Sequence, residues 1–198
     1  MKMNRRNVVV GLGTIVAGGG AALGSGAFST ASADRTLDVN VVTNTDIAAD
    51  FVDIILHVGD HSSIALGTDD DDPANLFPDS GDTYESDFSP SDTDVSLMQN
   101  DVTIVVGPDG SELPPNATVS YTDLFTVVND DGSTSQAFDV KFEATGGPSV
   151  EFNGTSNAQS TSYTANLGTG GDTEAISTDI NTGGSNDSGT LEITITEA

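Results

Sequence analysis

Short runs of alternating apolar and polar residues, separated by clusters of Gly, Asn, Asp and Pro, make up most of this chain after Ala33. Alternation with a period of two places every second side chain on the same face of a strand, so these runs predict half-buried β-strands. No stretch after Ala33 holds the period of an amphipathic helix. The pattern therefore predicts an all-β domain, a jelly-roll-like sandwich of two sheets.

About ten segments fit a strand: 36–42, 51–58, 95–98, 102–106, 118–121 with 124–128, 137–144, 150–152, 162–166, 173–177 and 190–196. The clearest expected hairpin joins 124–128 to 137–142, because the Asn-Asp-Asp-Gly-Ser connection at 129–133 is rich in residues that tolerate positive φ. One domain is expected over 34–198, with residues 69–88 as an acidic surface loop.

The first 33 residues have the form of a twin-arginine export signal. Arg5 and Arg6 precede an uncharged, glycine-rich apolar run that ends in small residues, and cleavage is expected between Ala33 and Asp34. A retained membrane anchor is the alternative, because the run is long enough to cross a bilayer. Its seven glycines between Gly11 and Gly26 disfavour a helix. We therefore expect an extracellular or cell-surface protein, exported by the twin-arginine route, without stable membrane insertion after cleavage.

Cleavage would concentrate negative charge on the mature domain. The signal takes three of the five basic residues and none of the 31 acidic ones, which leaves a net charge of −29 on 165 residues. Molar salt, with a Debye length of about 3 Å, would screen this repulsion, so we expect a halophilic protein that requires high salt. Nucleic acid and anionic membranes are excluded as partners. The absence of cysteine excludes disulfides and cysteine nucleophiles.

Three blocks carry a resemblance to known proteins: residues 24–41 with the twin-arginine leader, residues 119–132, and the closing residues 190–196. Together they resemble a family of secreted haloarchaeal surface proteins of unassigned function. That family is similar to the TasA/camelysin group of biofilm-matrix fibre proteins and to archaeal bundling pilins. The resemblance implies a jelly-roll subunit whose N-terminal strand inserts into the sheet of the next subunit.

The segment that would be exchanged is 34–42, which has one apolar face formed by Leu37, Val39 and Val41. Signal cleavage would place it at a chain end. It can then pair within its own sheet or complete the exposed edge of a neighbour by β-augmentation. Both pairings are open at the level of sequence.

The histidines do not match a catalytic motif. His57 and His61 are four residues apart, but Val58 stands where a zinc peptidase of the HExxH type needs glutamate. On a strand the two would also be separated by about 13 Å. No Gly-x-Ser-x-Gly elbow is present. We therefore expect no enzymatic activity and no catalytic residues, and interpret both histidines as polar surface residues.

The acidic loop is the one candidate metal locus. Asp69, Asp71 and Asp72 supply hard oxygen ligands of the kind that calcium prefers. The EF-hand pattern is not matched, because Pro73 falls at a ligand position. A solvated acidic loop without metal is the competing interpretation, and no other cofactor is expected.

Three sequons mark candidate glycosylation sites in an exported protein: Asn116, Asn153 and Asn186. Asn116 and Asn153 fall at predicted turns.

Taken together, the sequence predicts an exported structural protein of the cell surface or biofilm matrix, a filament subunit that self-associates by donor-strand exchange. The alternative is a monomeric surface module that binds calcium or a glycan.

Overall fold

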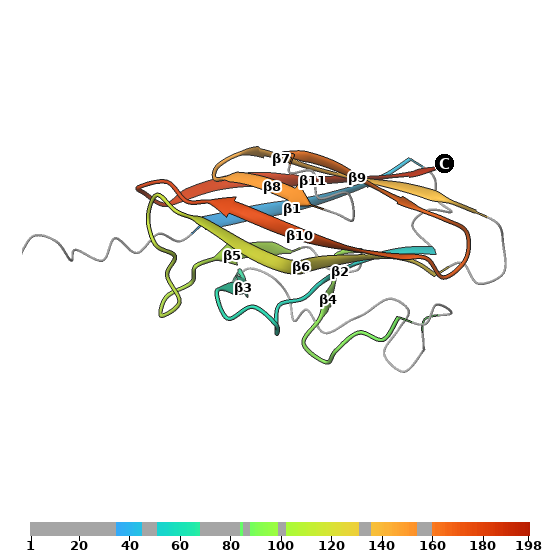
Figure 1. The fold of residues 1–198 in the computed structure, drawn as a ribbon, viewed down its shortest axis with the longest axis horizontal. Coiled ribbons are helices and arrows are strands. Elements are labelled where there is room, and N and C mark those ends of the chain that lie inside the picture. The colour runs from blue at the N-terminus through green and yellow to red at the C-terminus, as the bar shows by residue number, and fades with distance from the viewer. Residues whose placement is uncertain are drawn as a thin grey trace, which may run out of the picture. The chain divides into compact units, whose positions relative to one another are not determined.

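The computed structural model describes residues 35–44, 51–67, 84, 88–98, 102–130, 136–153 and 160–198. All of them belong to one compact unit, Ser32–Ala198. Two sheets pack against each other in this unit (Figure 1). The predicted all-β, two-sheet sandwich is confirmed.

Among the described residues, eleven strands form the two sheets. Sheet A has six strands in the order β3 (Ile64–Leu66), β5 (Thr103–Val106), β1 (Arg35–Thr43), β11 (Asp187–Glu197), β7 (Phe138–Gly146) and β9 (Ser162–Leu167). Sheet B has five, in the order β4 (Val95–Ser96), β2 (Val52–Leu56), β6 (Thr118–Asn129), β10 (Thr173–Asn181) and β8 (Ser149–Asn153). Odd-numbered strands lie in sheet A and even-numbered ones in sheet B, so the chain changes sheet after each of these strands.

This alternation between sheets overturns the predicted hairpin. β6 pairs with β2 and β10 in sheet B, whereas β7 pairs with β11 and β9 in sheet A. The apolar side chains of both strands face the same core from opposite sheets. At the end of β6, Asn129 donates its side-chain amide to the carbonyls of Gln136 (3.0 Å) and Gly168 (2.7 Å). These bonds tie the end of β6 to the chain just before β7 and just after β9.

The two predicted segments 118–121 and 124–128 are one strand, β6, interrupted by a bulge. Its register with β10 shifts between Ile176 and Thr178. Asp123 has a φ of 51°, and its backbone N–H donates to the Ser177 hydroxyl at 3.1 Å. The bulge leaves inward-facing side chains on both sides of it in the core.

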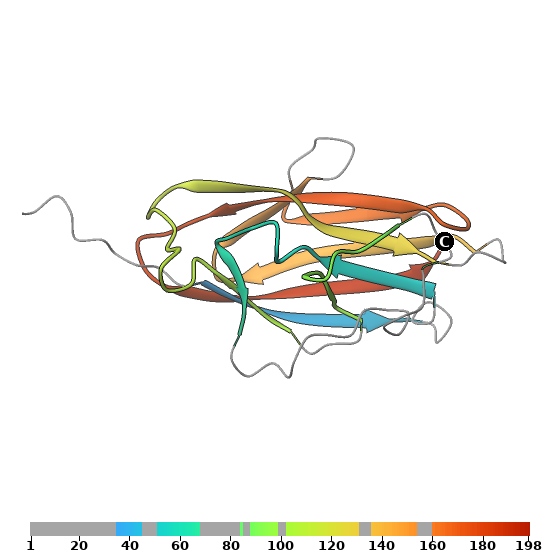
Figure 2. The ribbon, with the colours of Figure 1, turned by 90° about the horizontal axis from the view of Figure 1, so that it is seen from below.

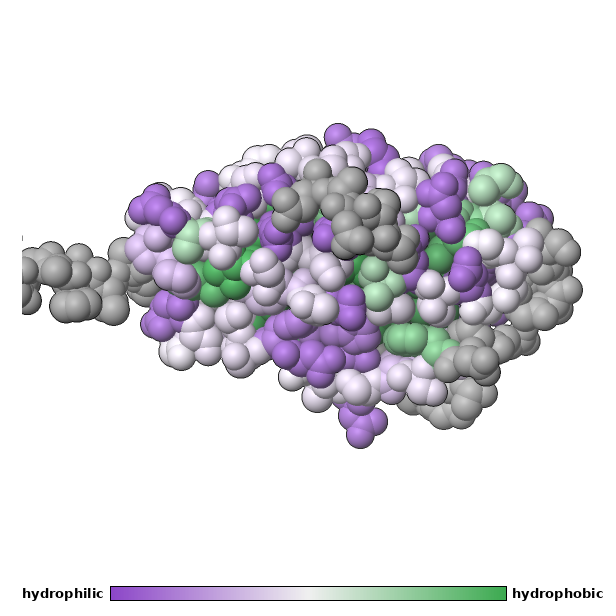
Figure 3. All heavy atoms as spheres, in the orientation of Figure 1, coloured by the Kyte–Doolittle hydropathy of each residue, from purple (hydrophilic) through white to green (hydrophobic). Residues whose placement is uncertain are grey.

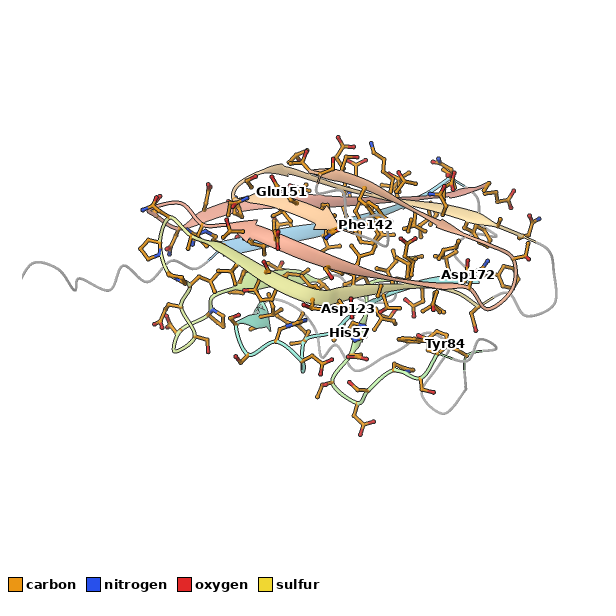
Figure 4. All side chains as sticks on the ribbon, in the orientation of Figure 1. His57, Tyr84, Asp123, Phe142, Glu151 and Asp172 are labelled. Carbon is orange, nitrogen blue, oxygen red and sulfur yellow. The ribbon has the colours of Figure 1, made fainter. Side chains whose placement is uncertain are left out.

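The core lies between the sheets and contains three phenylalanines whose rings meet at a tilt around Phe142. The ring centroid of Phe142 on β7 is 5.6 Å from that of Phe125 on β6 and 5.7 Å from that of Phe152 on β8. All three side chains are fully buried. Figure 4 labels Phe142. One strand of sheet A is thereby packed against two strands of sheet B.

The N-terminal strand β1 lies inside sheet A rather than at its edge. Figure 2 shows it, in blue, running beside the red β11. It pairs in parallel with the C-terminal strand β11 along its whole length, from Arg35 opposite Asp187 to Thr43 opposite Ile195. On its other side, Arg35 to Asp38 pair antiparallel with β5. The first and last strands of the domain are therefore neighbours.

Candidate functional site

The predicted exchange face lies on the core side of β1. Leu37 is buried, and Val39 and Val41 are partly buried and packed against the core cluster. Asp38, Asn40 and Val42, on the other face of the strand, are exposed. In this single chain β1 pairs with strands of its own sheet. This is the intramolecular one of the two pairings that the sequence leaves open. Exchange between copies stays a prediction.

The start of β1 contacts two loops that are bonded to each other. The Gly183 carbonyl accepts a hydrogen bond from Arg35 Nη2 at 2.9 Å and another from the Asn116 N–H at 3.3 Å. Buried Thr182 accepts the Ala117 N–H at its hydroxyl (2.9 Å) and donates its own N–H to the Ala117 carbonyl (2.7 Å). We call residues 114–117 and 182–183 the loop socket.

A polar cluster that the sequence reasoning missed lies on the outer face of sheet B. Asp53 on β2 is fully buried, and its carboxylate accepts hydrogen bonds from side-chain hydroxyls and from the backbone. The donors include the Tyr84 hydroxyl (2.8 Å), the Ser96 hydroxyl (2.6 Å) and the Ile54 N–H (2.7 Å). Because the carboxylate keeps several strong donors, its burial is tolerated.

His57 extends this cluster into an arrangement like that of a hydrolase triad. Its Nδ1 lies 3.0 Å from Asp94 Oδ1 and its Nε2 lies 2.8 Å from the Thr126 hydroxyl. Thr126, however, stands in mid-sheet, opposite Ile55 on β2 and Ala175 on β10. An acyl-transfer site needs backbone donors directed at the developing oxyanion, whereas the strand around Thr126 is paired on both sides.

The two histidines contact different partners. The His61 ring meets the Tyr121 ring edge-on, with centroids 5.4 Å apart, and does not take part in the His57 cluster. The two histidines, four residues apart in sequence, therefore take part in separate contacts. Their interpretation as polar surface residues is wrong for His57, whose side chain is only 13% exposed and is bonded at both nitrogens.

The described contacts favour a structural role for the polar cluster. Tyr84 and Phe88 pack over Ile55 and Val128 on the outer face of sheet B, with the two rings edge-on at 5.6 Å. Figure 4 shows His57 and Tyr84 on this side of the sandwich. The hydrogen bonds to Asp53 and Asp94 hold three separate segments together: β2 with His57, Tyr84, and residues 91–96. We call this set of contacts on the outer face of sheet B the polar clasp.

Tyr84→Phe tests the clasp. Burial, with the nearby carboxylate of Asp53, raises the pKa of the Tyr84 hydroxyl. The folded state thus holds this proton more tightly than the unfolded state, so the contribution is present below the ordinary tyrosine pKa of about 10 and is lost as the pH rises above it. At pH 7 the variant should lose about 1–3 kcal/mol of unfolding free energy. Chemical denaturation at pH 7 and pH 11 should show the difference shrinking at the higher pH.

Tyr163→Phe is the matched control for that experiment, because the Tyr163 hydroxyl also donates to a carboxylate, that of Glu174, but on a half-buried side chain. We expect a smaller loss at pH 7. Equal losses in both variants would contradict the clasp.

Several predicted site residues lie outside the described ranges: Arg5, Arg6, Ala33, Asp34, Asp69, Asp71 and Asp72. Among the residues the structure does describe, no group of three or more His, Cys, Asp or Glu side chains could hold a metal ion. No helix in those ranges has the length and hydrophobicity needed to cross a membrane. The calcium prediction for the acidic loop stays a prediction.

The three sequon asparagines occupy different settings. Asn116 is exposed in the loop socket with a φ of 53°, and Asn186 is exposed between β10 and β11. Asn153 is the last residue of β8 and is partly buried.

Comparisons with protein-family models, curated proteins and solved structures found no match to this chain.

Proposed function

We propose that this protein is an exported structural subunit of the cell surface or biofilm matrix, which self-associates into filaments by donor-strand exchange. The observation that carries the proposal is the position of β1. A strand at one end of the domain fills the middle of sheet A, between β5 and β11. Signal cleavage after Ala33 would leave it attached to the domain only through the residues that lead to β2.

Exchange would keep the contacts that β1 makes and change only the molecule that supplies them. Without β1, sheet A would separate into a β3–β5 part and a β11–β7–β9 part, each with an unpaired edge. A neighbour's β1 would restore both ladders and cover the exposed core. Because each subunit donates one strand and accepts one, the contact is heterologous and generates a filament unless it closes into a ring.

The assembly state of the mature protein tests this proposal. We expect concentration-dependent oligomers in sedimentation velocity at molar salt, and filaments in negative-stain microscopy of native surface material. A parallel run with a variant unable to be cleaved at Ala33 is the control, because its β1 would not be a free chain end. A mature protein that stays monomeric at high concentration and high salt would contradict the proposed function.

A second prediction concerns salt. Of the two basic residues after Ala33, Arg35 is buried and Lys141 is paired with Glu143, while hydrophilic side chains cover much of the visible face (Figure 3). Lowering the salt from molar to 0.1 M lengthens the Debye length from about 3 Å to about 10 Å, so acidic repulsion grows. The melting temperature should therefore fall by several degrees or more, as measured by circular dichroism.

Sucrose is the control for the salt series, because it favours the compact state by exclusion from the surface without screening charge. Sucrose should raise the melting temperature at every salt concentration and leave its dependence on salt in place. An unchanged melting temperature across the salt series would remove the argument for a halophilic protein.

A further inference from the structure

Arg35 is a charged residue in a core position. It lies on the same inward face of β1 as Leu37, Val39 and Val41, and its side chain is fully buried. Burying a guanidinium costs several kcal/mol unless hydrogen-bond partners replace its water. The Gly183 carbonyl is such a partner, at 2.9 Å from Nη2.

The partner of Arg35 is held in place by residues outside β1. The loop socket is closed by backbone bonds between Asn116 and Gly183 and between Ala117 and Thr182. The Thr182 hydroxyl adds contacts to the carbonyl oxygens of Pro114 (2.6 Å) and Ala117 (3.0 Å). The Gly183 carbonyl is therefore positioned by the β5–β6 and β10–β11 loops, and it would be offered equally to the domain's own β1 or to a second copy's.

The aliphatic residues of β1 do not by themselves define its register. A slip by one residue would turn the apolar face outward, but a slip by two would place an aliphatic side chain at most of the same inward positions. Arg35 distinguishes these registers. Moved forward by two residues, it would take the place of Leu37 opposite buried Ile104; moved backward, it would leave the loop socket.

We propose that Arg35 sets the register of β1 in sheet A and thereby selects the peptide that this sheet accepts: an extended strand with arginine two residues before three alternating aliphatic residues. Where the strand comes from a second copy, this inference rests on the proposed function. The register itself can be tested whichever chain supplies the strand.

Paired cysteines can report the register, because the chain has none of its own. Val42 is opposite Thr194 on the outer face of sheet A. Neighbouring strands lie about 4.8 Å apart, within the Cα separation of a disulfide. V42C with T194C reports the observed register, and V42C with E192C or T196C reports a slip by two residues. Each pair is made in the full chain with Arg35, with Arg35→Leu and with Arg35→Lys, and is oxidised at molar salt.

With Arg35 present, the V42C/T194C pair should oxidise at least about tenfold more completely than either slipped pair, because a slip buries an unpartnered charge. In Arg35→Leu the slipped pairs should rise to within a few-fold of it. Arg35→Lys, which keeps the charge, should retain the preference. A strict preference for T194C in Arg35→Leu would overturn the proposal. If Arg35→Leu does not fold, Arg35→Met is measured in its place and is judged by the same outcome.

The size of the oxidised product separates this inference from the proposed function. A disulfide within one chain that depends on Arg35 supports the register role and counts against strand exchange. A disulfide between chains that depends on Arg35 supports both. Cross-linking between chains that is indifferent to Arg35→Leu supports exchange and overturns the register role.

Discussion

Aspartate at both Val39 and Val41 should remove β1 from sheet A and, under the proposed function, abolish assembly. Each substitution places a carboxylate on the face that packs against the core, and an unpaired charge there costs several kcal/mol. Two such costs are comparable with the whole stability of a domain, about 5–15 kcal/mol. Circular dichroism and sedimentation velocity at molar salt measure the two consequences, loss of fold and loss of oligomers. Aspartate at Asn40 and Val42, exposed on the other face of the same strand, is the matched control and should leave both unchanged.

A peptide of residues 34–43 separates the two pairings of β1. If sheet A accepts a strand from outside, the added peptide should restore the fold of the double variant, because it supplies the missing strand in trans. The Arg35→Leu version of the peptide should restore it less well or in mixed register. A double variant that stays unfolded at saturating peptide would count against donor-strand exchange and leave β1 as an ordinary internal strand.

Phe142→Ala is expected to destabilise the domain strongly. Phe142 is fully buried and lies between Phe125 and Phe152, so its removal leaves a cavity shared by the two sheets. Truncations of this kind cost about 3–5 kcal/mol. Denaturant unfolding should show the loss as a lower midpoint with an unchanged m-value. Thr145→Ala, on the exposed face of the same strand, should change the midpoint little, and equal losses in both variants would contradict this account of the core.

The strands could be predicted because most of them bury one face. β1, β7 and β11 show the alternation directly, and their predicted ranges overlap the observed ones. β3 was missed because Ile64–Leu66 is too short for a period to appear. The hairpin between β6 and β7 was wrong for a different reason. Loop composition indicates that the chain turns, but the choice between the same sheet and the opposite sheet depends on which partners the flanking strands find.

The polar clasp could not be predicted from the spacing of its residues along the sequence. Asp94 and Thr126 meet His57 only because β4 and β6 flank β2 in sheet B. The sequence nevertheless carries one signal for the clasp, at Asp53, and a separate one for the buried Arg35. Asp53 interrupts an otherwise apolar run, and a buried acid in such a run requires donors. Arg35 is one of only two basic residues after Ala33, and its place at the start of an aliphatic face was a sign of a special position.

The pairing of β1 with β11 also sets the order in which the molecule can fold. Among the strands, the ribosome makes β1 first and β11 last, so the longest ladder of β1 joins segments from opposite ends of the sequence. Contacts of such high order form late. At the usual rates of synthesis, a chain of 198 residues takes about ten seconds or more to complete. Until β11 is made, β1 lacks its main partner and can pair only through Arg35–Asp38, with β5.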